Sequence, residues 1–212
     1  MLKFQSRGGE TDLYRIIADK DGAVVTVTGG PNTAYNLNQG EFVEFQSAED
    51  FTVESTEAIL IAHMLTSCSN ASGTKDPTLY PGDYEASANC GTSTDADDLG
   101  DPALSFITPR DQWRGRYTFA APGTYAWDIV TVVAESFVWP TIALDGGGLP
   151  LPENLPGTSL VSATFAVGDG AHVIESTAGS FGLEVYGYDC RVSYAYAGGL
   201  SLGIINTPPA PQ

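Results

Sequence analysis

The sequence predicts an all-β protein made of two β-sandwich-like units, which form an internal duplication and are joined by a long acidic loop. The 212 residues include 24 glycines and 13 prolines, and 10% of the residues are aromatic. This composition is typical of many short strands connected by tight turns. Short runs of β-branched and aromatic residues also recur between turn residues, and the two halves of the chain resemble each other.

Each predicted strand is a short run of β-branched and aromatic residues bounded by Gly, Pro, Asn or Asp. The runs are 24–28, 41–46, 59–65, 117–120, 129–134, 141–144, 160–167, 172–176 and 181–188. Asp-Gly pairs at 21–22, 145–146 and 169–170 predict hairpin-type turns, because Gly tolerates positive φ. No long segment has a helical period, and we expect one helical turn near 109–113.

The duplication is read from five segments of the first half that align, in the same order, with segments of the second. Residues 12–18 (DLYRIIA) align with 128–134 (DIVTVVA), and 52–57 (TVESTE) with 173–178 (VIESTA). Residues 25–30, 40–45 and 58–68 align with 141–146, 159–165 and 180–190. A shared order at a nearly constant offset indicates a repeated unit. The alternative is that small β units simply look alike.

The second copy is preceded by a predicted strand at 113–119, whose counterpart in the first copy would lie before Met1. A sheet that lacks an edge strand exposes unpaired backbone groups, which another chain can fill. The predicted organisation is a first unit at 1–66, an acidic inter-unit loop at 67–110, a second unit at 111–205 and a Pro-rich linker at 206–212.

Charge excludes several classes of partner. The chain holds 9 basic and 26 acidic residues, for a formal net charge of −17, which disfavours nucleic acid and anionic membranes. No apolar run is long enough to cross a bilayer, so we expect no membrane insertion. Glu54 and Glu175 align and raise a glycosidase alternative. However, they recur because the strand recurs, with one in each copy, so we expect no enzyme.

Several segments resemble a known family. They are GDPALSFITP (100–109), QWRGRYTFAAPGTYAWD (112–128), VGDGAHVIES (167–176), FGLEVYGYD (181–189) and VSYAYAGGL (192–200). Together they resemble the IgGFc-binding protein N-terminal domain family, in the form found in bacterial secreted and surface proteins. The resemblance covers nearly all of 1–205 and implies an extracellular, all-β, non-catalytic binding or adhesion module. Binding of antibody Fc is not carried over, because no residues are matched to it.

Three cysteines are too few for a disulfide scaffold. In the exported protein that the resemblance implies, a Cys68–Cys90 disulfide would close the acidic loop and contribute roughly 3 kcal/mol by loop entropy. Cys190 would then be a thiol or pair with a cysteine outside this sequence. A Cys68–Cys190 bridge, or three reduced thiols in an intracellular protein, are the alternatives.

The acidic stretch DADDLGD at 95–101 predicts the one candidate cofactor, a calcium ion. Its carboxylates belong to Asp95, Asp97, Asp98 and Asp101. Carboxylate oxygens from a flexible loop suit Ca²⁺, although the Glu at the twelfth position of an EF-hand loop is missing. The alternative is a solvated acidic loop without a metal, in which case the protein has no cofactor.

Aromatic residues of the second copy predict a ligand-binding face. They are Trp113, Tyr186, Tyr188, Tyr194 and Tyr196. Alternate residues of a strand share a face, and exposed rings suit protein or glycan ligands. The alternative is a Tyr-rich core whose hydroxyls bond to backbone groups.

The functional prediction is a non-catalytic binding or adhesion module of a larger secreted or cell-surface protein, which contacts a protein or a glycan. A second hypothesis is a structural spacer or fibre subunit that assembles by β-strand addition at the open edge. A carbohydrate-active β-sandwich enzyme ranks third.

Overall fold

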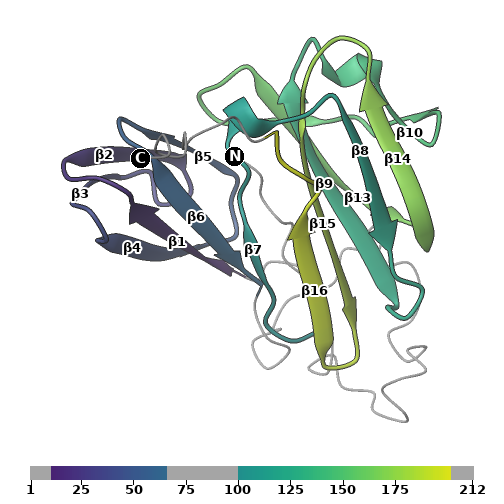
Figure 1. Ribbon diagram of the computed structural model, residues 1–212, viewed down its shortest axis with the longest axis horizontal. Coiled ribbons are helices and arrows are strands. Elements are labelled where there is room, and N and C mark those ends of the chain that lie inside the picture. The colour runs from purple at the N-terminus through teal and green to yellow at the C-terminus, as the bar shows by residue number, and fades with distance from the viewer. Residues whose placement is uncertain (1–10, 66–99, 202–212) are drawn as a thin grey trace, which may run out of the picture.

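The structure is a computed structural model that describes residues 11–65 and 100–201 (Figure 1). Within these residues the regular elements are sixteen strands and two single-turn 3₁₀ helices. The predicted all-β class is therefore confirmed. One of the two helices, η4 (Arg110–Gln112), lies where the sequence predicts a single helical turn.

The first unit is a sandwich of two antiparallel sheets. Its strands are β1 (Asp12–Ala18), β2 (Ala23–Gly29), β3 (Ala34–Leu37), β4 (Phe42–Ser47), β5 (Phe51–Ser55), β6 (Ile59–Met64) and β7 (Leu104–Phe106). The sheets have the orders β4-β1-β6-β7 and β3-β2-β5. Alternate residues of β1, such as Tyr14 and Ile16, are buried against Val25 and Val27 of β2. The period of two in a strand explains this pattern.

The second unit, on the right in Figure 1, is a larger sandwich. Its strands are β8 (Arg116–Ala121), β9 (Trp127–Glu135), β10 (Ile142–Leu144), β11 (Gly147–Gly148), β12 (Glu153–Asn154), β13 (Leu160–Val167), β14 (Gly170–Ser176), β15 (Gly182–Asp189) and β16 (Val192–Ala197). A 3₁₀ turn, η5 (Trp139–Thr141), precedes β10. The sheets have the orders β12-β13-β9-β15-β16 and β11-β10-β14-β8. Val130, Val132, Ile174 and Phe181 form the centre of the core.

The two units share a topology. The order β4-β1-β6-β7 matches β13-β9-β15-β16, and the pair β2-β5 matches β10-β14. The register agrees as well, because Tyr14 faces His63 across β1 and β6, as Val130 faces Val185 across β9 and β15. These are positions that the sequence alignment equates. Origin of the two units by duplication stays a prediction, which this topology fits.

The units pack through a shared apolar core. Trp113, Val133 and Leu160 of the second unit belong to the same buried cluster as the core of the first. Gly29, with φ +83°, marks a close approach, because a Cβ atom there would lie 2.7 Å from Pro156 Cγ. The first unit thus covers the outer face of the second unit's larger sheet. That cover explains why β15 is buried along its whole length.

Part of the predicted inter-unit loop is a strand. β7 lies inside the 67–110 segment, pairs with β6 and extends the first unit's sheet. Gly100 N donates to the Asp189 carbonyl, which ties the chain just before β7 to the second unit. Residues 67–99, with Cys68, Cys90, Asp95, Asp97 and Asp98, lie outside the described residues.

Candidate binding surface

The five rings predicted to bind a ligand do not form an exposed face. Trp113, Tyr186 and Tyr188 are buried, because the first unit covers the side of β15 that alternation alone would leave in solvent. Tyr194 and Tyr196 are half-buried. The Tyr196 hydroxyl donates to the Ala120 carbonyl at 2.6 Å. The placement of these rings therefore matches a Tyr-rich core.

Tyr194 closes one end of the second unit. Its ring lies across Gly187, where a Cβ atom would come within 2.4 Å of the ring, and its hydroxyl donates to the Asp128 carboxylate. Burial raises the pKa of Asp128 to about 6; the hydrogen bond from Tyr194 opposes this rise and the nearby Asp169 adds to it. The contact holds β16 onto β9 and uses the hydroxyl that a ligand would otherwise contact.

Of the four predicted calcium ligands, Asp101 alone lies among the described residues. Asp101 is exposed, and its backbone N–H donates to Ser193 Oγ at 2.9 Å. The other three predicted ligands lie outside the described residues. Among residues 11–65 and 100–201, no group of three or more His, Cys, Asp and Glu side chains is placed to hold a metal ion. The calcium site stays a prediction.

Cys190 is disulfide-bonded in the structure. The sequence offers only Cys68 and Cys90 as partners within the chain, and both lie outside the described residues. The Cys68–Cys90 bridge and the alternative Cys68–Cys190 bridge both stay predictions.

A buried ionisable cluster lies where the units meet. His63 Nε2 is 3.1 Å from the Asp12 carboxylate, and burial lowers the pKa of His63 although Asp12 raises it. Burial also raises the pKa of Glu184, and the neighbouring Ser105 hydroxyl opposes only part of this rise. His63 and Glu184 are fully buried. They belong to the packing between the units and offer no surface to a ligand.

The aligned glutamates Glu54 and Glu175 occupy different surroundings. Glu54 lines a groove of about 570 Å³ between the units, beside β5 and residues 107–113. Glu175 lies on β14 and forms an ion pair with Arg116 at 3.2 Å. Glu175 is not part of the groove lining, so the two glutamates do not face each other across it as a glycosidase pair would.

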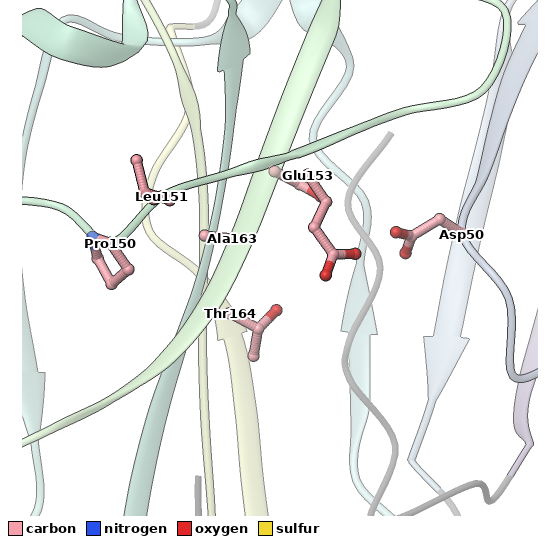
Figure 2. A pocket seen from close by; sticks show the side chains of 7 residues that line it. Asp50, Pro150, Leu151, Glu153, Ala163 and Thr164 are labelled. Carbon is pink, nitrogen blue, oxygen red and sulfur yellow. The ribbon is translucent and has the colours of Figure 1, made fainter. Parts of the chain in front are cut away.

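A smaller pocket of about 140 Å³ lies beside β12 and β13. Figure 2 shows the carboxyl groups of Asp50, from the first unit, and Glu153, from the second, pointing toward each other. Thr164 and Leu151 line the rest of the pocket. Two facing carboxylates disfavour an acidic ligand, and the pocket is too small to hold a protein segment.

The outer face of the sheet β4-β1-β6-β7 carries several exposed apolar side chains. Residues directly opposite each other in neighbouring strands share a face. The register links Ile17 with Phe42 and Leu60, and Leu13 with Met64, which faces Leu104. We call the set Leu13, Ile17, Phe42, Leu60, Leu104 and Phe106 the apolar face.

Four of the six side chains of the apolar face are exposed, and Leu13 and Ile17 are half-buried. Phe42 is 53% exposed, Leu60 46%, Leu104 54% and Phe106 48%. Arg15 lies among them, with its guanidinium carbon 4.7 Å from the centroid of the Phe42 ring and an ion pair to Glu44 at 2.7 Å. Monomeric soluble proteins rarely expose contiguous apolar patches of more than about a few hundred Å². Patches above that size mark interaction sites.

In the second unit, the equivalent face of the sheet is covered by another part of the protein. Ile129, Thr131 and Val133 hold the equivalent positions on β9, and all three are buried under the first unit. A sequence signal for the apolar face exists in β6, which reads ILIAHM. Consecutive apolar residues indicate a strand that is apolar on both faces, whereas alternation indicates one solvated face.

The comparisons with known proteins give one match. The family described as IgGFc binding protein matches residues 2–187. This chain belongs to the IgGFc-binding protein family. No curated protein and no solved structure matches it significantly.

Family membership supports an extracellular binding module. The family is of a non-enzymatic, binding type, and its domains typically come from secreted or extracellular proteins. Its name implies a protein ligand. Among the described residues, no helix has the length and apolar character needed to cross a membrane.

Proposed function

We propose that this chain is a non-catalytic adhesion module of a larger secreted or cell-surface protein, and that it binds a protein through the apolar face. The exposure of this face on β4, β6 and β7 is the observation that carries the proposal. Its members Ile17, Leu60 and Leu104 are aliphatic. Aliphatic side chains suit the core of a protein interface, whereas sugar rings are bound by aromatic platforms and polar groups.

Charge shapes the choice of partner. The net charge of −17 favours encounter with a basic protein surface, because complementary charge steers association. Arg15 is held by Glu44 and by the Phe42 ring, so it presents a fixed polar group inside an apolar surface. Such an arrangement favours one orientation of the partner.

The first experiment measures binding of the immunoglobulin Fc fragment, because the family description names it. The test variant is Leu104→Ser with Phe106→Ser, on the apolar face. The matched control is Phe137→Ser with Leu151→Ser, because both side chains are exposed but lie outside that face. We expect about a tenfold or larger loss of affinity for the test variant alone. Equal effects of both variants would contradict the proposal.

A glycan array is the second arm of this experiment. Glycan binding that survives Leu104→Ser with Phe106→Ser would replace the proposed protein ligand with a sugar. Dynamic light scattering addresses the other candidate, a structural subunit that assembles by strand addition. Within the described residues β5 has no strand on its outer side, which favours that candidate. A strict monomer at high concentration would count against it.

A further inference from the structure

The outer edge of β5 presents unpaired backbone groups in a defined register. β5 pairs with β2, where Glu54 faces Thr26, and Thr56 N donates to the Val24 carbonyl at 3.2 Å. Antiparallel residues alternate between hydrogen-bonded and non-bonded pairs. The backbone groups of Glu54 and Thr56 therefore point toward β2. Those of Phe51, Val53 and Ser55 point away from β2, toward an edge where the described chain places no strand.

The equivalent edge of the second unit is filled. β14 aligns with β5, so His172, Ile174 and Ser176 hold the places of Phe51, Val53 and Ser55. Ser176 N donates to the Gly115 carbonyl at 2.9 Å. Ile174 and His172 face Tyr117 and Phe119 of β8. The backbone groups of β14 that bind β8 therefore correspond to the backbone groups of β5 that face outward.

The groove of about 570 Å³ runs along this edge. It is lined by β5, by the start of β6 and by residues 107–113. Ile61 and Ile107 give it an apolar floor and belong to the first unit's core. Glu54 and Asp111 also line the groove, and neither forms an ion pair among the described residues. The groove therefore fits a strand that carries alternate apolar side chains and a basic residue.

We propose that this groove is a strand-acceptor site, and that its occupant is the segment 2–6 of the same chain, which lies outside the described residues. The segment reads LKFQS and matches YTFAA at 117–121 of β8, so Leu2 and Phe4 take the places of Tyr117 and Phe119. Both of those rings are buried. Alternate apolar residues in a strand with one buried face are the pattern this edge requires.

The connections on either side of the comparison have similar lengths, with one residue fewer before Asp12 than before its aligned residue Asp128. β8 ends at residue 121 and β9 begins at 127, so residues 122–126 join them. Segment 2–6 is followed by residues 7–11, and β1 begins at 12. Both connections contain turn-forming glycine, at Gly8 and Gly9 in the first and Gly123 in the second. A strand at 2–6 can therefore reach β5 as β8 reaches β14.

Charge supports the same register. With Leu2 opposite Val53, Lys3 lies opposite Thr52 and on the same face as Glu54. Diagonal neighbours on one face of an antiparallel pair are within reach of long side chains. In the second unit, Arg116 of β8 lies directly opposite Glu175 and pairs with it at 3.2 Å, so a basic residue on that strand reaches the glutamate that aligns with Glu54. Lys3 would thus meet the carboxylate that β5 leaves without an ion pair among the described residues.

A designed disulfide in the full chain tests the register. Lys3 and Thr52 form a non-hydrogen-bonded pair in this register, whose Cα atoms are about 4.5 Å apart and suit a disulfide. We expect Lys3→Cys with Thr52→Cys to link within one chain, read by mass spectrometry of peptides made without reductant. The control, Gln5→Cys with Thr52→Cys, is displaced by two residues and should link about tenfold less. A link between two chains, equal linking or no linking would overturn the proposal.

Amide hydrogen exchange gives a second readout that needs no added cysteine. The N–H groups of Phe51 and Val53 should be protected in the native chain. Phe4→Pro removes a donor that faces β5 and should expose both amides. Lys3→Pro removes a donor that faces away and should leave them protected. Unprotected Phe51 and Val53 amides in the native chain would overturn the proposal. The apolar face plays no part in either readout, so failure here leaves the proposed protein binding intact.

Discussion

Removing the charge of Glu184 should stabilise the protein above neutral pH. Glu184 is fully buried on β15, and neither of its carboxylate oxygens has a hydrogen bond of ordinary geometry. Burial raises its pKa well above the ordinary value of 4.5, and the charge of nearby Asp12 raises it further. An ionised carboxylate at this place therefore costs folding free energy. Glu184→Gln keeps the shape and removes the charge.

The sign of the pH dependence follows from proton binding. The folded chain holds the Glu184 proton more tightly than the unfolded chain, so this group lowers stability as pH rises above 4.5 through its folded pKa. His63 acts in the opposite direction, because its pKa is lowered and its contribution is lost as pH falls below 6.5. Since His63 is present in both proteins, the difference between variant and wild type isolates Glu184.

The magnitude comes from the cost of burying an unsatisfied polar group, about 1–3 kcal/mol and more for a charge. We expect Glu184→Gln to raise the free energy of unfolding by about that amount at pH 8, and by less at pH 4.5. Urea unfolding at several pH values measures it. The control is Glu175→Gln, whose side chain is 57% exposed and should change stability by less than about 0.5 kcal/mol. Destabilisation by Glu184→Gln at pH 8, or a difference from wild type that is independent of pH, would show that the buried carboxylate does not lower stability.

Three further perturbations have expected outcomes. Cys190→Ser should lower the free energy of unfolding by about 4–5 kcal/mol, because a bridge to either other cysteine closes a loop of about 100 residues or more; unchanged urea unfolding would contradict this. Gly187→Ala should lower the free energy of unfolding by about 1–3 kcal/mol, because the added Cβ atom would lie 2.4 Å from the Tyr194 ring. Gly168→Ala, with nothing within 4 Å, should have almost no effect in the same assay. Millimolar Ca²⁺ should raise the melting temperature, and less so with Asp101→Asn; no shift in the unaltered chain would remove the calcium site.

The strands and turns could be predicted because their signals are local. The nine predicted runs all coincide with strands of the structure. The Asp-Gly turns follow as well: Gly22, Asp145 and Gly146 have φ of +75°, +49° and +83°, which the turn residues supply. The alignment of the two halves also equates positions that share a register in β1 and β9.

The contacts between units could not be predicted in this way. Alternation of Tyr186 and Tyr188 indicates one shared face, but their burial depends on the first unit covering that face. The strand β7 reads only LSF, and pairs because the chain returns along β6. Glu184 lies in a strand with the sequence of an ordinary half-exposed one, and becomes fully buried only by the same packing. Each of these features depends on residues far apart in the sequence.

Hydrogen exchange of the full chain, with and without bound Fc fragment, tests most directly whether the apolar face binds a protein. We expect binding to slow exchange in β6 and β7, with no comparable change around Tyr194 and Tyr196. Leu104→Ser with Phe106→Ser should remove that protection. Protection confined to the β15–β16 end of the second unit, with β6 and β7 unchanged, would contradict the account.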